Sequence, residues 1–230
     1  MKSYYIYLLR HGLTEGNALG KYIGHTDESL SQEGIAQIER MKKDYDYPSA
    51  PIVFSSPLKR CLETAKLIYP ACEPIELEGL IECNFGEFED RTAAELEEHP
   101  VFPDWIAGKQ GVAPPFGESN EEFAKRIAET FVKMVDGLLK TGTRKCAVIT
   151  HSGVLSALLS FFGLPEAPMH EWTVPGGCGY EIRITPSLWS QARKVEVTAQ
   201  IPYIPGEKDE GYVSADDFDA DFNVEDYLYD

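Results

Sequence analysis

The chain is predicted to fold as an α/β domain in which helices cover both faces of a mostly parallel β-sheet. Strand-like and helix-like segments alternate along the sequence, and this alternation is typical of a parallel sheet. A length of 230 residues suits one domain of this class. Hydrophobic residues make up 43% and charged residues 26% of the chain, which excludes collagen, coiled coil and wholesale disorder.

Six segments are predicted to be strands because they are short, apolar and rich in β-branched or aromatic residues. In chain order they are Tyr4–Leu9, Ile52–Phe54, Ile75–Leu77, Cys146–Thr150, Tyr180–Ile184 and Val195–Ile201. The first stops at Arg10-His11-Gly12, and the fourth stops at His151-Ser152-Gly153. Two of the predicted strands therefore end in a histidine that a small residue soon follows.

Four helices are predicted between these strands. Residues 31–43 have a helical apolar period and begin with a capping serine. The second helix is expected to begin at Ser55-Ser56-Pro57, because serine caps helices and proline is favoured at the first helical position. A capping box at Ser119-Asn120-Glu121-Glu122 opens a long third helix, and Val154–Phe162 is an apolar fourth.

The chain is divided into one domain, residues 1–205, and an acidic tail, residues 206–230. Within the domain, residues 99–118 are rich in proline, glycine and aromatic side chains. A long irregular insertion in a compact domain often covers a binding site, so this segment is predicted to be a lid.

The charge of the chain argues against nucleic-acid partners. The net charge is −17, and residues 207–230 hold ten acidic and one basic side chain. Such a balance repels phosphate backbones.

The sequence also predicts a cytoplasmic protein without a membrane partner. No apolar run reaches the roughly 20 residues that a spanning helix needs. The apolar patch at the N-terminus is too short for a signal peptide. The five cysteines are scattered without a Cys-x-x-Cys pair, which favours free thiols in a reducing compartment.

The candidate chemistry gathers at the carboxyl ends of three predicted strands, where open α/β sheets bind ligands. Arg10 and His11 follow the first strand, Arg60 lies soon after the second, and His151 follows the fourth. Arginine offers planar donors that match phosphoryl oxygens, and a neutral imidazole can attack phosphorus. Gly12 and Gly153 are expected to let the backbone approach a ligand. Singly, each residue suits an ordinary loop or surface role, but together they favour a phosphoryl-transfer site.

Such a site also needs an acid for the leaving oxygen. Glu82 lies among apolar neighbours, and apolar surroundings raise the pKa of a carboxyl group. Glu87 and Glu89 are the nearby alternatives. The residues alone favour Glu82 only weakly.

These motifs resemble the histidine phosphatase superfamily, branch one, also called the phosphoglycerate mutase-like family. The resemblance covers roughly residues 4–185, and its most specific part is the signature Arg-His-Gly-x-Thr-x-x-Asn. The matching segments are Leu9–Asn17, Asp27–Gly34 with Gln37, Ser55–Ala65, Asn84–Glu89, Gly117–Ser119 with Phe123 and Arg126, and Thr150–Gly153. The resemblance implies a three-layer α/β/α sandwich with a mostly parallel sheet of about six strands.

The resemblance also implies a role for each site residue. His11 would be the phosphorylated nucleophile, while Arg10, Arg60 and His151 would hold the phosphoryl group. Asn17 would help to bind that group. Glu82 would donate a proton to the leaving group and then act as the base for water. Neither a metal nor an organic cofactor is implied.

Within the family, the sequence favours a phosphomonoester hydrolase over a phosphoglycerate mutase. Mutases carry an Arg-Arg pair that is absent here, and Cys83-Asn84-Phe85-Gly86 stands where they have Arg-x-Tyr-Gly. Residues 165–178 are similar to alpha-ribazole phosphatases, which makes alpha-ribazole 5′-phosphate a candidate substrate. Leu13 departs from the family signature, where glutamate is more usual, and leaves the substrate open.

Two hypotheses from other classes of protein have weaker support in the sequence: a metal site and a non-catalytic phosphate-binding module. The five histidines have no His-Glu-x-x-His spacing, and the calcium-loop-like run Asp217–Asn223 has Phe222 where the turn glycine belongs. A non-catalytic module that merely binds phosphate would not need His11 and Glu82, which the chain retains.

Overall fold

The computed structural model describes residues 3–205 and contains one seven-stranded sheet. The strand order is β3-β2-β4-β1-β6-β7-β5. The strands are β1 (Tyr4–Arg10), β2 (Val53–Ser55), β3 (Ile75–Glu76), β4 (Lys145–Thr150), β5 (Gly163–Leu164), β6 (Gly179–Ile184) and β7 (Val195–Ile201). All pairings are parallel except those that β6 makes with β1 and β7. The mostly parallel sheet is therefore confirmed.

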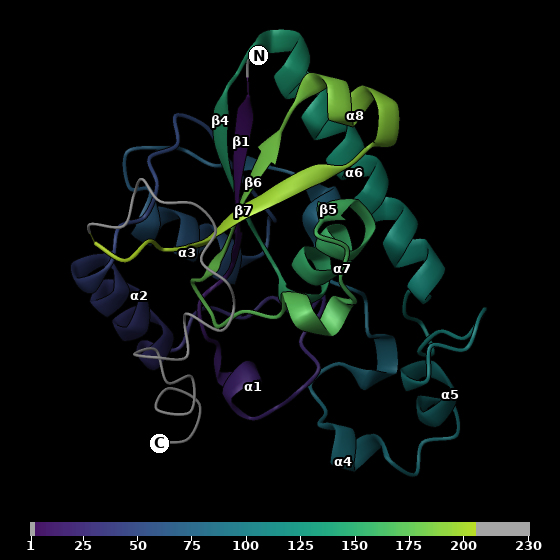
Figure 1. Cartoon of the computed structure of the whole chain (residues 1–230). Helices are drawn as coiled ribbons and strands as arrows, with labels where there is room; N and C mark the ends of the chain where they lie inside the picture. The colour runs from purple at the N-terminus through teal and green to yellow at the C-terminus, as the bar shows by residue number, and fades with distance from the viewer. Residues whose placement is uncertain (1–2, 206–230) are drawn as a thin grey trace.

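Helices cover both faces of this sheet, which gives three layers (Figure 1). Figure 1 shows α2 and α3 on one side of the sheet and α6, α7 and α8 on the other. The helices are α1 (Glu15–Ala18), α2 (Gln32–Asp44), α3 (Lys59–Ile68), α4 (Ala93–Leu96), α5 (Phe102–Ile106), α6 (Asn120–Thr141), α7 (Ser152–Phe162) and α8 (Pro186–Ala192). Three single turns of 3-10 helix are Glu78–Leu80, Gly86–Phe88 and Met169–Trp172.

The sheet contains one strand more than the six predicted. The additional strand, β5, is only two residues long and follows α7 directly, at the glycine where the sequence predicts that helix to end. It pairs with β7 at the edge of the sheet. A segment of two residues is too short to show the alternation that predicts a strand. Its strand conformation depends on the pairing with β7.

Helix α3 begins at Lys59, two residues later than the sequence predicts. The expected cap, Ser56, uses its hydroxyl elsewhere: its Oγ lies 2.9 Å from His151 Nε2. The first turn is capped instead by Asp27, whose Oδ1 accepts a hydrogen bond of 2.8 Å from the Lys59 backbone. A capping partner 32 residues away cannot be found from the local sequence.

The long helix α6 confirms its predicted cap and its predicted buried face. Ser119 and Glu122 form a reciprocal capping box, and Gly142 ends the helix in the left-handed conformation. The buried side chains of α6 are Phe123, Ile127, Phe131, Met134, Val135 and Leu138. Each such side chain stabilises the fold by about 1.5–3 kcal/mol relative to exposure.

The segment that contains α4 and α5 has a small core of its own. Phe88, Leu96, Phe102 and Trp105 form a buried cluster separate from the main one. Tyr22 joins this cluster to the rest of the chain through edge contacts with Phe85, Phe102 and Trp105. The apolar side chains Phe102 and Trp105 of the insertion at residues 99–118 therefore pack in this aromatic cluster rather than in the main core.

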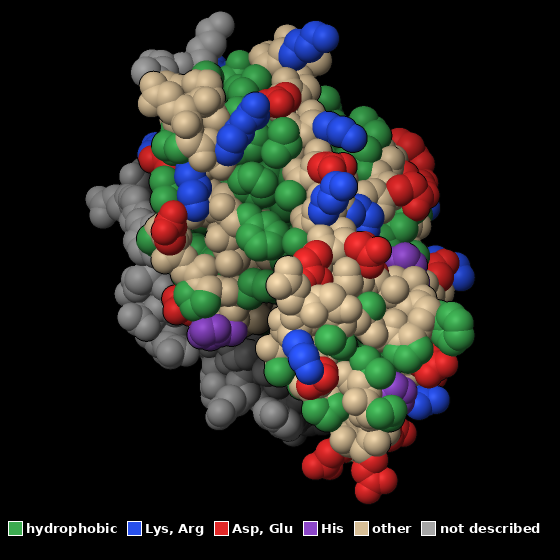
Figure 2. All heavy atoms as spheres, turned by 90° about the vertical axis from the view of Figure 1, so that its right-hand side faces the viewer, with side chains coloured by type: hydrophobic (Ala, Val, Ile, Leu, Met, Phe, Trp, Pro, Cys, Tyr) green, Lys and Arg blue, Asp and Glu red, His purple; other side chains and the backbone are tan. Residues whose placement is uncertain are grey.

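The side of the molecule that carries α6–α8 shows interspersed basic and acidic side chains (Figure 2). Among residues 3–205, no helix is both long and apolar enough to span a bilayer. All five cysteines are free thiols, as predicted. The acidic tail of residues 206–230 lies outside the described part of the chain.

Candidate active site

The two histidines predicted from the strand ends meet in the structure. Strands β1 and β4 are parallel neighbours in register, with Arg10 opposite Thr150. The His11 backbone donates a hydrogen bond of 2.9 Å to the Thr150 carbonyl. The rings of His11 and His151 consequently lie edge to face, with their centroids 5.1 Å apart.

The His11 ring is held in one orientation and is almost fully buried. Its Nδ1 lies 2.7 Å from the carbonyl oxygen of Gly12. Because a carbonyl only accepts, Nδ1 carries the proton, and Nε2 of the neutral ring keeps its lone pair. Burial, and then the positive charges of Arg60 and Arg10, hold the pKa of His11 well below its usual range. The ring is therefore a neutral potential nucleophile at physiological pH.

Arg60 is fully buried and joins His151 to a loop that folds over it. Its Nε lies 3.3 Å from His151 Nδ1. Its terminal nitrogens donate to the carbonyls of Thr26 and Gly24, each at 2.7 Å. Burial is the main cause that lowers the pKa of His151, followed by the charges of His11 and Arg60. Since Ser56 lies at the other ring nitrogen, both nitrogens of His151 have protein partners.

Arg10 and Asn17 each have a buried polar atom without a partner among the described residues. These atoms are Arg10 Nε and Asn17 Oδ1. Arg10 is anchored at its other end, where Nη1 donates to the Val174 carbonyl at 2.8 Å. Buried polar groups are ordinarily hydrogen-bonded, so unpartnered ones indicate where a ligand binds. The side-chain amide of Asn17 can also present its nitrogen, because amide orientation is assigned rather than observed.

Glu82 is the carboxylate that reaches this site. It is 7% exposed, and its oxygens accept hydrogen bonds from the Gly153 and Cys83 backbones at 2.8 and 3.0 Å. Burial raises the pKa of Glu82, although these two hydrogen bonds and the charges of Arg60 and Arg10 oppose the rise. A Cβ at Gly153 would lie 2.4 Å from Glu82 Oε1, so only glycine leaves room for this carboxylate.

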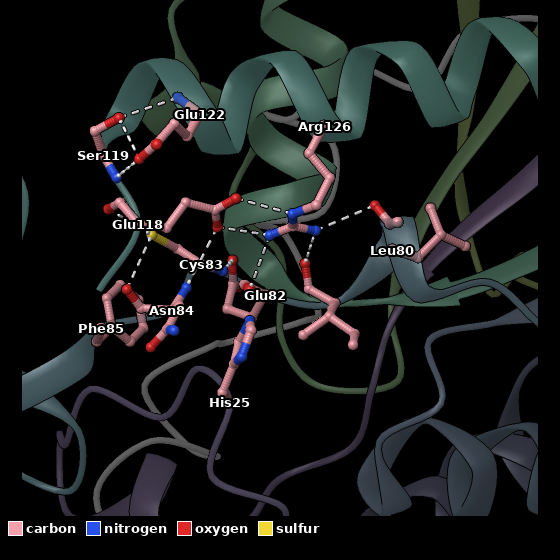
Figure 3. A network of polar contacts seen from close by, with 12 residues as sticks. His25, Leu80, Glu82, Cys83, Asn84, Phe85, Glu118, Ser119, Glu122 and Arg126 are labelled. Atoms are coloured by element: carbon pink, nitrogen blue, oxygen red, sulfur yellow. Dashed lines mark hydrogen bonds and ion pairs between the residues drawn. The ribbon is translucent and has the colours of Figure 1, made fainter. Parts of the chain in front are cut away.

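A partly buried ion pair supports the backbone around Glu82 (Figure 3). Arg126, on α6, forms two hydrogen bonds to the Glu118 carboxylate, at 2.9 and 2.7 Å. The same guanidinium donates to the carbonyls of Ile81 and Glu82 at 2.8 and 3.2 Å. The segment that carries Glu82 is therefore attached to the longest helix of the described chain.

The two alternative acids have other surroundings. The Glu89 carboxylate accepts hydrogen bonds from the backbones of Gly24, His25, Thr26 and Phe85 and from the Thr26 hydroxyl. Glu87 is exposed and lies 3.7 Å from His99. Of the three carboxylates, only Glu82 contacts the turn that begins at His151.

The comparisons with known proteins agree with this geometry. The family model of the histidine phosphatase superfamily (branch 1) matches residues 6–196. The chain belongs to this superfamily. An adenosylcobalamin/alpha-ribazole phosphatase from Salmonella typhimurium is 29% identical over 184 residues, which cover 78% of this chain and 90% of the relative. A Yersinia pestis relative named "probable phosphoglycerate mutase" is 32% identical over 70% of this chain and 75% of its own length.

Solved structures give the same result. The alpha-ribazole phosphatase from Shigella flexneri superposes with a TM-score of 0.69 at 25% identity, covering 84% of this chain and 94% of that one. The histidine phosphatase described here is accordingly an enzyme that hydrolyses phosphate esters. No group of three or more histidine, cysteine or carboxylate side chains suited to a metal ion occurs within residues 3–205. The calcium-loop-like run of residues 217–223 lies outside that range.

Three features of this phosphatase differ from the sequence interpretation or were not predicted by it. Gly12 does not bring its backbone to a ligand: its N–H donates to Thr64, and a Cβ there would lie 2.7 Å from Ile38 Cδ1. The partners of His151 include Ser56, which the sequence presents only as a helix cap. The hydrogen bonds of Glu89 were also not predicted, because three of its four backbone partners lie more than 60 residues away.

Proposed function

We propose that this phosphatase hydrolyses phosphomonoesters through a phosphohistidine formed on His11, without a metal. The observation that carries the proposal is the hydrogen bond from His11 Nδ1 to the Gly12 carbonyl, which leaves the lone pair on Nε2. A neutral, fixed imidazole beside two buried arginines suits nucleophilic attack on a phosphoryl group. Arg10, Asn17, Arg60 and His151 are the residues proposed to bind the phosphoryl oxygens. His151 would exchange its contact with Ser56 for one with the phosphoryl group.

In the first step, His11 Nε2 forms a bond to phosphorus as the bond from phosphorus to the ester oxygen breaks. Glu82, in its acid form, gives its proton to that oxygen, and the alcohol leaves. The raised pKa of Glu82 supports this role, because a carboxyl group must be protonated to act as an acid. Arg10 and Arg60 balance the charge of the transferred group.

In the second step, the Glu82 carboxylate takes a proton from water as the water oxygen attacks phosphorus. The bond between phosphorus and Nε2 breaks, and inorganic phosphate is released. His11 returns to its neutral form and Glu82 to its acid form. The two backbone hydrogen bonds to Glu82 hold the carboxylate in place between the steps.

The substrate we propose is a small phosphorylated metabolite, with alpha-ribazole 5′-phosphate as the first candidate. The names of the Salmonella and Shigella relatives support this substrate. The Yersinia relative supports a phosphoglycerate mutase as the alternative. The absence of an Arg-Arg pair from the sequence favours hydrolysis. Residues 99–118 are proposed to act as a lid over the substrate, in a cytoplasmic enzyme.

Substitution of the nucleophile tests the mechanism. His11→Ala is expected to abolish turnover of p-nitrophenyl phosphate, and the unaltered enzyme is expected to keep its activity in EDTA. Enzyme quenched during turnover should carry acid-labile, base-stable phosphate. His170→Ala, at an exposed histidine, is the matched control. Full activity in His11→Ala would overturn the proposal, and loss of activity in EDTA would overturn its metal-free form.

A further inference from the structure

The segments around the candidate site contain few positive charges besides Arg10 and Arg60. These segments are residues 10–28, 55–60, 79–90, 150–154 and 172–178. They contain seven carboxylates and four lysine or arginine side chains, of which two are the pocket arginines. The other two are Lys21 and Lys59.

Both lysines already face a carboxylate. Lys59 Nζ lies 3.5 Å from Asp27 Oδ2, and the other oxygen of Asp27 caps helix α3. Lys21 Nζ lies 2.9 Å from Asp90 Oδ1. A second anion on a substrate would have to displace one of these carboxylates and leave it nearby. The exchange of one carboxylate for another anion brings no net attraction.

The arginines next to these segments are also engaged. The Arg126 guanidinium donates hydrogen bonds to the Glu118 carboxylate and to the carbonyls of Gly79, Ile81 and Glu82. Arg91 lies near Glu95: hydrogen bonds from Thr92, with smaller contributions from the charges of Lys21 and Arg91, lower the pKa of Glu95. Arg126 is therefore not free to receive a substrate anion, and the charge of Arg91 already acts on Glu95.

We infer that the pocket selects phosphomonoesters whose leaving group carries no second anionic group. This inference rests on the proposed function and names its substrate class. Arg10 and Arg60 attract the phosphoryl group. The leaving group then lies next to segments in which carboxylates outnumber the unpaired lysine and arginine side chains. Specificity of this kind comes from repulsion of the wrong substrate rather than from contacts to the right one.

Two substrates of matched size test the inference. Glycerol 3-phosphate has a hydroxymethyl group at the position where 3-phosphoglycerate has a carboxylate. At pH 8, where a free imidazole is neutral, kcat/KM for glycerol 3-phosphate is expected to exceed that for 3-phosphoglycerate by about ten-fold or more. The gap should narrow at high salt, since charge repulsion is screened. Equal values for the two substrates would overturn the inference.

Removal of the blocking carboxylates gives a gain-of-function test. Asp27→Asn keeps an oxygen that caps α3 and frees Lys59, while Asp90→Asn suits the left-handed backbone at φ 61° and frees Lys21. At least one of these variants is expected to raise kcat/KM for 3-phosphoglycerate by about two- to five-fold, with glycerol 3-phosphate unchanged. No selective gain in either variant would overturn the inference.

Two controls separate the inference from the proposed function. Glu166→Gln removes the carboxylate that faces Lys194, and this change should leave the ratio of the two substrates unchanged. Lys194 precedes β7, at the end of the sheet away from the carboxyl ends of β1 and β4. A selective gain in this variant would also overturn the inference, because the effect would not depend on the pocket. Hydrolysis of p-nitrophenyl phosphate reports the proposed function alone: its absence refutes that function, whereas its presence with unselective kinetics refutes only the substrate class.

Discussion

At the scale of single residues, the site depends on which atoms are left without a protein partner. His11 has one nitrogen bound and one lone pair free, and Arg10 and Asn17 each have a buried atom without a partner in the described chain. The sequence predicts all three residues. From the residues alone Glu82 is favoured only weakly over Glu87 and Glu89, because that choice depends on contacts between distant segments. The bond from the Gly153 backbone to Glu82 spans 71 residues.

Glu82→Gln tests the acid–base residue. The amide keeps the shape but cannot donate an acidic proton, so turnover of an alkyl phosphate is expected to fall by about 10²–10⁴-fold. The loss should be smaller for p-nitrophenyl phosphate, whose leaving group hardly needs a proton. Equal losses on both substrates would point to a structural role. Glu87→Gln, at the exposed neighbour, should leave both rates unchanged.

The pH profile provides a second measurement for the same variant. Glu82 must be protonated in the first step, so kcat/KM falls as pH rises through its pKa, and the raised pKa moves this fall to higher pH. His11 must be neutral to attack phosphorus, so kcat/KM also falls as pH drops through the pKa of His11. Because that pKa is lowered, this acidic fall lies well below pH 6.5. Glu82→Gln should lose the alkaline fall and keep the acidic one. A retained alkaline fall would assign it to another group.

Gly153→Ala tests whether the space for the Glu82 carboxylate matters. The added Cβ would lie 2.4 Å from Oε1, so the carboxylate must move. Displacement by about 1 Å can cost about 10²-fold in rate. We expect kcat to fall by this order while far-ultraviolet circular dichroism stays unchanged. Full activity would show that the carboxylate position is not critical.

Gly137→Ala is the matched control for this substitution. Nothing lies within 4 Å of a Cβ at Gly137, inside helix α6. Its activity should be unchanged. Its free energy of unfolding should rise by about 0.5–1 kcal/mol, because alanine is the better helix former.

At the scale of elements, the sequence predicts what is local. The strand Val195–Ile201 and the capping box of α6 are found at the residues predicted. Helix α3 begins late because its predicted cap binds a histidine and a distant aspartate replaces it. Helix α8 was missed although Pro186 begins it, since one proline at a first position is a weak signal on its own.

The loop of residues 23–27 is the element whose position is least predictable from the sequence. It supplies the carbonyls that hold Arg60, and Glu89 binds three of its backbone amides. Glu89, which the sequence offers as an alternative acid, thus anchors the loop that positions Arg60, one of the arginines proposed to bind phosphate. Loop anchoring and acid catalysis predict different effects for the same substitution of Glu89.

Glu89→Gln distinguishes anchoring from catalysis. The amide replaces one accepting oxygen by a donor that faces backbone N–H groups, so unfolding free energy should fall by about 1–3 kcal/mol. KM should rise, because Arg60 loses support, while the alkaline fall of kcat/KM stays. Urea denaturation and the pH profile measure both. Unchanged stability together with a lost alkaline fall would make Glu89 the acid in place of Glu82.

At the scale of the whole molecule, the chain is strongly acidic, whereas the candidate site contains Arg10 and Arg60. The net charge is −17, and residues 207–230 contribute −9 of it. Acidic side chains also outnumber basic ones in the segments around the site. A phosphate ester is therefore expected to approach against the net charge of the chain and to be attracted near Arg10 and Arg60. The tail is predicted to slow this approach without taking part in the chemistry.

Truncation after Pro205 tests the effect of the tail charge. The remaining chain carries −8, so kcat/KM for an anionic ester should rise by up to about ten-fold at 10 mM salt. The difference should disappear at high salt, since the screening length falls from about 30 Å at 0.01 M to about 3 Å at 1 M. A tail that instead covers the pocket would change the preference among substrates at every salt concentration. A full-length variant with the ten tail acids replaced by asparagine or glutamine should match the truncated enzyme if charge alone acts. If that variant behaves like the unaltered enzyme while truncation changes selectivity, the tail acts through contact, and the electrostatic prediction is wrong.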